Sequence, residues 1–271
     1  MLQLLADRII LCPSRNEIRV EHKRRQSLKH DLGEVEVWTQ RRSRNGSGGH
    51  HVGGPHLSIL KFGGGGSPAE RATIFPLDFW DDASAEIWAP NWPGFGTSAG
   101  RASVRYLAEV GAYCYEEVQR AAAGRPVVVT GNSLGTAIAL FVAAKFRDMN
   151  AIVLRNPPPL RQLITGKHGW YSAWVGAWLI SRCVPPSLDS IQNARGSDVP
   201  ALFVTSGKDR VVPPVFQDRV FDAYAGPKRR MLLPQADHAD FPHENDIPGL
   251  REHLQWLRQR GGLAAGTPAG A

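Results

Sequence analysis

The stretch VVVTGNSLGTAIAL at residues 127–140 constrains the fold more than any other part of the chain. Its run of valines, bounded by turn residues, is typical of a strand buried on both faces of a parallel sheet. The small and apolar residues from Leu134 onward are typical of a helix. Gly131 and Gly135 flank Ser133 at the junction, where a sharp turn brings the backbones of two elements close together. The stretch therefore predicts a strand–turn–helix unit that exposes the side chain of Ser133.

The same alternation of strand and helix patterns continues along the chain. Strands are predicted at 34–40, 56–62, 86–90, 126–130, 151–155, 201–206 and 228–234, and helices at 103–123, 134–147, 215–226 and 247–260. Short connections between alternating elements favour a mostly parallel central sheet flanked by helices. We expect one α/β domain over residues 34–260, with a small helical insertion (a lid) near 158–197 where the alternation breaks. Residues 1–33 then form an N-terminal extension of open role, and 261–271 a flexible tail.

The charge of the chain does not favour a nucleic-acid partner. The net charge is +7, but the basic residues concentrate in RVEHKRRQSLKH and TQRRSRNG. A nucleic-acid groove needs a basic stripe with exposed aromatic residues among the charges, and no such stripe is visible. A solvated basic surface is the simpler interpretation.

Membrane insertion, a disulfide framework and a metal site are not expected either. The longest apolar stretch, WYSAWVGAWLI, has 11 residues, fewer than a bilayer span needs, and Asp7 and Arg8 interrupt the apolar N-terminus. The three cysteines form no C-x-x-C pair, and the loop histidines His50, His51 and His56 match no metal motif. We therefore expect a cytoplasmic protein without metal or cofactor, whose oligomeric state the sequence leaves open.

Three polar residues directly follow predicted strands, at the sheet edge where open parallel sheets bind their ligands. Ser133 follows VVVT, Asp209 follows ALFVTS, and His238 follows MLLP. A serine on a tight turn can act as a nucleophile, a histidine as its base, and a carboxylate can orient the imidazole. His243 is a competing base, although it lies further from its strand. The order serine, acid, histidine predicts a triad of Ser133, Asp209 and His238.

The glycines of KFGGGG predict the second part of such a site. An oxyanion hole needs backbone N–H groups, and we expect them from Leu134 after the nucleophile and from Gly65 or Gly64, with Gly65 favoured. The spacing Gly64-x-Gly66-x-x-Ala69 also matches a dinucleotide fingerprint. The next predicted strand ends in Pro90 and Asn91 rather than in an acid, which disfavours that alternative.

These motifs resemble the α/β-hydrolase superfamily over roughly residues 34–260, and in particular its bacterial branch related to serine aminopeptidases and acyl esterases. The resemblance rests on KFGGGGSPAER, NWPGFGTSAG, VVVTGNSLGTAIAL, LFVTSGKDRVVPP and LPQADH. It implies that NWPGFGTS shapes the mouth of the active site and that GKDRVVP carries the acid. Many members open the oxyanion loop with His-Gly, whereas this chain has Gly63 and Gly64, so its loop is expected to be positioned differently.

The predicted function is hydrolysis of an ester, thioester or amide through an acyl-enzyme, most readily by a carboxylesterase acting on a small or apolar acyl substrate. A serine peptidase acting on short peptides is the alternative, and a non-catalytic binding protein with this fold is the alternative from another class. A dehalogenase is disfavoured, because that branch places Asp where this chain has Ser133.

The insertion contains three tryptophans at helical spacing. Trp170, Trp174 and Trp178 recur every fourth residue and so share one face of a predicted helix. As a lid, this face would bind an apolar acyl group. Packing on the core and contact with a membrane surface are the alternatives that the sequence leaves open.

Overall fold

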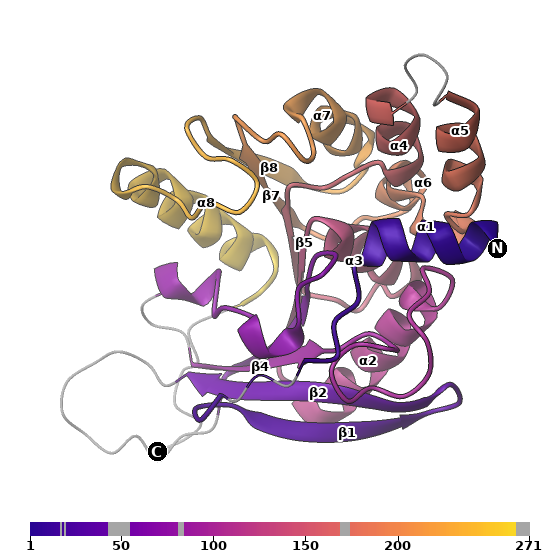
Figure 1. Ribbon diagram of the computed structural model, residues 1–271. Helices are drawn as coiled ribbons and strands as arrows, with labels where there is room; N and C mark the ends of the chain where they lie inside the picture. Colours follow the sequence, from indigo (N-terminus) through magenta and orange to yellow (C-terminus); the bar gives the residue numbers. More distant parts are fainter. Residues whose placement is uncertain (17, 19, 43–54, 81–83, 169–173, 264–271) are drawn as a thin grey trace, which may run out of the picture.

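The computed structural model describes residues 1–263 except 17, 19, 43–54, 81–83 and 169–173 (Figure 1). Within this part of the chain, eight strands form one sheet in the order β1-β2-β4-β3-β5-β6-β7-β8. The strands are β1 (Arg24–His30), β2 (Gly33–Arg42), β3 (Leu57–Phe62), β4 (Ala85–Pro90), β5 (Val127–Asn132), β6 (Ala151–Arg155), β7 (Ala201–Ser206) and β8 (Lys228–Leu233). β2 pairs antiparallel with both β1 and β4, and all other neighbours are parallel.

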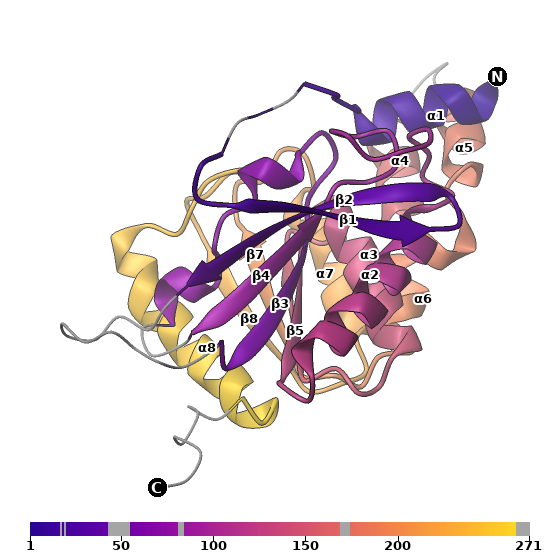
Figure 2. The ribbon, with the colours of Figure 1, turned by 90° about the horizontal axis from the view of Figure 1, so that it is seen from below.

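Helices cover both faces of the sheet (Figure 2). They are α1 (Leu2–Leu11), α2 (Leu107–Ala122), α3 (Leu134–Lys145), α4 (Leu160–His168), α5 (Trp174–Arg182), α6 (Ser190–Arg195), α7 (Pro214–Ala223) and α8 (Ile247–Arg260). The valines of β5 show how the core divides. Val127 and Val129 pack in the cluster that includes α2, α3, α6 and α7, whereas Val128 packs in the cluster that includes α8. A strand buried on both faces needs apolar residues at every position, which explains the continuous valine run.

The predicted fold class is confirmed. The chain forms a mostly parallel sheet between two helical layers, and β3 to β8 lie within about two residues of their predicted positions. The structure adds β1, which lies inside the stretch taken as an N-terminal extension and pairs with β2 as the edge strand. The division into an extension, a domain and a tail stays a prediction, and residues 264–271 of that tail lie outside the described residues.

The segment between β6 and β7 is helical and packs against the first helix. It contains α4, α5, a short 3₁₀ turn (Pro186–Leu188) and α6. α6 contacts α3 as a crossover helix does, whereas α4 and α5 form a pair, and α5 also contacts α1. Both views show α1 beside this pair (Figures 1 and 2). None of the described helices is long and apolar enough to cross a bilayer.

Candidate active site

Ser133 lies on a strained turn between β5 and α3. Its φ of 52° and ψ of −121° are unusual for a residue with a side chain, and such strain persists only where the surroundings impose it. The two flanking glycines explain how the turn is built. A Cβ on Gly135 would lie 2.2 Å from the carbonyl oxygen of Phe62, and a Cβ on Gly131 would lie 2.6 Å from Cα of Thr136. The turn therefore needs glycine on both sides of the serine.

Asp209 and His238 contact each other although they are 29 residues apart in sequence. Asp209 Oδ2 lies 2.7 Å from His238 Nδ1. The same oxygen accepts from Gln217 Nε2 at 3.2 Å, and Oδ1 accepts from the N–H groups of Val211 and Val212 at 2.8 and 2.7 Å. The carboxylate is buried and accepts on both oxygens, so its orientation is fixed. A carboxylate held in this way keeps the imidazole in one tautomer, with Nε2 directed away from the acid.

The end of β6 holds the loop that carries His238. Asn156, fully buried and with a φ of 52°, donates from Nδ2 to the carbonyl oxygen of His238 at 3.0 Å. Its Oδ1 accepts from the N–H of Ser206 at 2.9 Å, which connects the same side chain to the end of β7. Arg155 donates from Nη2 to the carbonyl oxygen of Asp240. Ser133 also donates its N–H to the carbonyl oxygen of Arg155 at 2.9 Å, so β6 contacts both the turn and the histidine loop.

The glycine loop after β3 lies against the serine. A Cβ on Gly64 would lie 3.4 Å from Cβ of Ser133, whereas a Cβ on Gly65 would lie 2.6 Å from the carbonyl oxygen of Ile10 in α1. Gly64 thus contacts the serine, whereas Gly65 and Gly66 contact the end of α1. Leu134 begins α3, where the first N–H groups of a helix have no partner within the helix.

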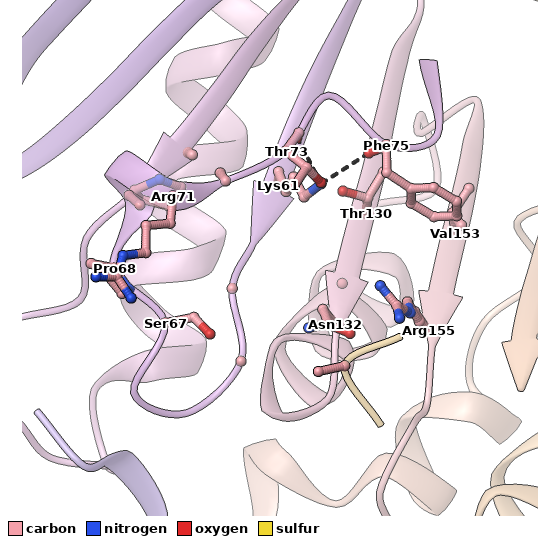
Figure 3. A pocket seen from close by; sticks show the side chains of 18 of the residues that line it. Lys61, Ser67, Pro68, Arg71, Thr73, Phe75, Thr130, Asn132, Val153 and Arg155 are labelled. Carbon is pink, nitrogen blue, oxygen red and sulfur yellow. Dashed lines mark hydrogen bonds between the residues drawn. The ribbon is translucent and has the colours of Figure 1, made fainter. Parts of the chain in front are cut away.

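A cavity of about 250 Å³ opens next to these groups (Figure 3). Its walls include the chain neighbours of the predicted site residues: Asn132 before Ser133, Gly63 and Gly64 of the glycine loop, and Ala239 after His238. Other lining residues come from β3, from the loop 66–75, from the ends of β4 and β6, and from Phe241. The cavity therefore lies at the carboxyl edge of the parallel strands, where ligands bind in folds of this type.

Lys61 lines this cavity and is bonded to the loop that contains Thr73 and Phe75. Its Nζ donates to the carbonyl oxygen and Oγ1 of Thr73 at 2.8 and 2.9 Å and to the carbonyl oxygen of Phe75 at 3.0 Å (Figure 3). Burial lowers the pKa of Lys61 to about 7, against the opposing influence of Asp78. Arg155 in the opposite wall also has a lowered pKa, because its burial outweighs the influence of Asp209 and Asp240.

The predicted tryptophan face is only partly described. Trp170 and the side chain of Trp174 lie outside the described residues. Trp178 is 40% exposed on α5, with the Arg182 guanidinium 4.8 Å from its ring centre. It is not among the described residues that line the cavity, so its role in substrate binding stays a prediction.

The described histidines, cysteines and acids form no group of three or more that could hold a metal ion. His50 and His51 lie outside the described residues. His243 caps a short 3₁₀ turn (Glu244–Asp246), because its side chain and its N–H both form hydrogen bonds with Asp246. Among the described residues it makes no hydrogen bond to Asp209.

Comparison with known proteins supports the fold. Residues 63–180 match the model of the alpha/beta hydrolase fold family, a stretch that includes Ser133 but not Asp209 or His238. An uncharacterised protein of Mycobacterium tuberculosis is 28% identical over 153 residues, which are 55% of this chain and 52% of that relative. The chain thus spans about half the length of this relative. With this match and the sheet order above, the chain has the alpha/beta hydrolase fold, and the predicted resemblance is confirmed at the level of the fold.

Solved structures agree with this fold. A puromycin-hydrolysing peptidase of Mycobacterium tuberculosis superimposes with a TM-score of 0.66 at 16% identity, covering 94% of this chain and 42% of that chain. A 2,6-dihydroxy-pseudo-oxynicotine hydrolase superimposes with a TM-score of 0.65 at 19% identity, covering 91% of this chain and 70% of that chain. At these identities the likeness concerns the fold alone.

The structure also reveals residues that the sequence did not single out. Asn156 and Gln217 each contact a predicted triad residue, yet they lie 82 and 8 residues from it in the chain. The one signal for Asn156 was its place directly after a buried strand, the position that Ser133 and Asp209 share. No sequence pattern marked Gln217, because one buried amide does not change the apolar periodicity of a surface helix.

Proposed function

We propose that this protein is a serine hydrolase that cleaves a carboxylic ester through an acyl-enzyme on Ser133. The observation that carries the proposal is the hydrogen bond of 2.7 Å between Asp209 and His238, which follow β7 and β8 of the sheet in which Ser133 follows β5 on a strained turn. A serine on such a turn and an imidazole oriented by a buried carboxylate are the two parts that nucleophilic acyl transfer needs.

The reaction proceeds in two halves. His238 takes the proton of the Ser133 hydroxyl as its oxygen attacks the carbonyl carbon, and the Asp209 carboxylate stabilises the imidazolium. The N–H of Leu134 and an N–H of the glycine loop stabilise the oxyanion. The imidazolium then protonates the leaving alcohol, and the same histidine activates water to release the acid. The contact between Gly64 and Ser133 supports Gly64 as strongly as Gly65 for the second donor.

An ester substrate is favoured over a peptide with a free amino terminus. A peptidase of that kind needs a carboxylate to bind the amine, and the described residues that line the cavity include Lys61, Arg71 and Arg155 but no Asp or Glu. Thioester and amide cleavage use the same catalytic groups, so thioester and amide substrates should be assayed beside the esters. The cytoplasmic location and the small-molecule substrate stay predictions from the sequence.

Replacement of Ser133 by Ala tests the proposal. The variant is expected to lose more than about 10³-fold in kcat for 4-nitrophenyl butyrate, because the nucleophile is removed, and to keep its melting temperature within a few degrees. Ser27→Ala, an exposed serine of β1, is the matched control and should keep wild-type activity.

A fluorophosphonate reagent separates an enzyme from a binding protein with the same fold. It should phosphonylate Ser133 alone, as read by peptide mass spectrometry, because only an activated serine reacts. Wild-type turnover by the Ser133→Ala variant, or a failure of the reagent to label Ser133, would refute the proposed mechanism.

A further inference from the structure

The cavity beside Ser133 carries positive charge. Its charged lining residues in the described chain are Lys61, Arg71 and Arg155, and all three are cationic side chains (Figure 3). Arg71 lies at the exposed rim, and no ion pair is recorded for it among the described residues. A molecule that enters this cavity therefore meets cations from the rim inward.

Lys61 contributes only part of a charge at neutral pH, because its pKa is about 7, and it has no free donor. The three hydrogen atoms of an ammonium group match the three acceptors that it already contacts on Thr73 and Phe75. Its role is to hold the loop 71–75 over the cavity. The ligand must then be bound by other groups.

Two buried donors in the wall have no partner among the described residues. Thr130 is 3% exposed on β5, and its Oγ1 makes no hydrogen bond in the structure. Arg155 is 9% exposed at the end of β6, and while its Nη2 donates to Asp240, its Nε is also without a partner. Buried polar groups in folded proteins are nearly always hydrogen-bonded, to protein, water or a ligand. Two unpartnered donors on one cavity wall therefore indicate an occupant that accepts hydrogen bonds.

The acids that balance these cations lie outside the lining. Asp209 and Asp240 interact with Arg155, and Asp209 is already bonded on both oxygens. Asn132 Oδ1, on another lining residue, is buried without a partner too; as an acceptor beside Ser133 it would accept a hydrogen bond from water or from another part of the substrate.

We infer that this cavity binds a carboxylate at the far end of the acyl chain of the substrate, through Thr130 Oγ1, Arg155 Nε and, at the rim, Arg71. The acyl side is favoured because Gly63 and Gly64, which line the cavity, adjoin the expected position of the carbonyl oxygen. A volume of about 250 Å³ suits a short chain. The inference rests on the proposed function and names its substrate class: the monoester of a short dicarboxylic acid.

A pair of esters of similar chain length tests the inference. Monomethyl glutarate carries the carboxylate and methyl hexanoate does not, and acid release from each is followed by chromatography. The wild-type protein should favour the glutarate ester in kcat/KM by about tenfold or more, since hydrogen bonds to charged groups are stronger than neutral ones.

Two variants then locate the preference. Thr130→Val removes the hydroxyl with little change in shape, and Arg71→Gln removes the rim charge. Each should lower the ratio of the two kcat/KM values by about tenfold. Arg195→Gln, an exposed arginine of α6, makes the same charge change away from the cavity and should leave the ratio at the wild-type value. If Thr130→Val instead raises the melting temperature and leaves the ratio unchanged, the hydroxyl is only an unpaired buried group and the inference is wrong.

Glutarate binding separates this inference from the proposed function. Calorimetric titration of Ser133→Ala with glutarate should show binding that the added Arg71→Gln change weakens about tenfold. If methyl hexanoate is hydrolysed but glutarate neither binds nor adds a preference, the hydrolase function stands and the carboxylate site is overturned. If glutarate binds but neither ester is cleaved, the site stands and the proposed ester hydrolysis is overturned.

Discussion

Ser133 and Asn156 share a backbone conformation that few residues with side chains adopt. Each has a φ of 52° at the end of a parallel strand, and β5 and β6 are neighbours in the sheet. Strain of this kind costs about 1–3 kcal/mol per residue and persists where other contacts impose it. At Ser133 they are backbone hydrogen bonds to Arg155 and Thr136, and the flanking glycines permit the close approach. At Asn156 they are hydrogen bonds to Ser206 and His238.

Asn156 should therefore act on catalysis through the position of His238. Asn156→Asp keeps the acceptor for Ser206 but loses the N–H that binds the histidine loop. We expect a fall in kcat of about tenfold with little change in KM, and a lower melting temperature, because a buried carboxyl group then faces the carbonyl oxygen of His238. Asn193→Asp is the matched control, because Asn193 also donates to a backbone carbonyl, that of Ser187, but within α6 and its preceding turn. Equal kinetics for both variants would contradict a positioning role.

Lys61 gives the stability of the protein a pH dependence. Its pKa is about 7 in the folded protein, below the ordinary value of 10.5. Between these two values the unfolded chain binds more protons than the folded one, so the lysine makes the free energy of unfolding rise as pH rises. The largest slope from one group is about 1.4 kcal/mol per pH unit.

Urea unfolding of the wild type and of Lys61→Met at pH 7, 8 and 9 measures this contribution. The wild type should gain stability relative to the variant with each step, because methionine does not titrate. Parallel stability curves for the two proteins would show that Lys61 keeps its ordinary pKa.

Among the secondary-structure elements, α3 and β3 make the closest contact near the site. The contact depends on Gly135, since a Cβ there would lie 2.2 Å from the carbonyl oxygen of Phe62 and 2.7 Å from that of Gly63. Gly135→Ala must therefore push the start of α3 away from the glycine loop. We expect a loss of about 1–3 kcal/mol in the free energy of unfolding and a larger proportional loss of esterase activity.

Gly176→Ala is the control for this prediction. Gly176 lies within α5, and a Cβ there meets no atom within 4 Å. Its replacement should stabilise the protein by up to about 1 kcal/mol through helix propensity. Thermal unfolding of both variants compares them, and equal stability would show that the close approach at Gly135 relaxes without cost.

The elements that the sequence did not predict lack a periodic apolar pattern. β1, RRQSLKH, is an edge strand whose residues are mostly exposed, so no alternation marks it. α1 buries Ala6, Asp7 and Leu11 while other leucines stay exposed, and the charged Asp7 interrupts the pattern that would reveal its inner face. By contrast, β5, β6 and β7 are buried on both faces, and their apolar runs gave their positions directly.

For the whole molecule, the sequence predicted the edge of the sheet at which the candidate site lies better than it predicted the contacts that position the site residues. The strand ends before Ser133, Asp209 and His238 meet at one edge, because parallel strands share their direction. The cavity could not be predicted, since its wall combines β3, β5 and β6 with two loops whose packing depends on the complete fold.

α1 connects segments that are far apart in the chain. Asp7 Oδ1 accepts from the N–H of Val104 at 3.0 Å, and the carbonyl oxygen of Leu11 accepts from the N–H of Gly66 at 2.7 Å. The helix also contacts α5 of the insertion. The first helix thus contacts the glycine loop directly.

Removal of residues 2–12 should therefore affect catalysis more than folding. The glycine loop loses its contacts with Ile10 and Leu11, and a displacement of about 1 Å at an oxyanion donor is enough to lower the rate up to about a hundredfold. The sheet keeps all its strands, so far-UV circular dichroism should still show a folded α/β protein. Truncation after Leu263 is the matched control, since it removes a similar number of residues and keeps every described residue that lines the cavity. Full kcat/KM for 4-nitrophenyl butyrate after removal of residues 2–12 would contradict a supporting role for α1.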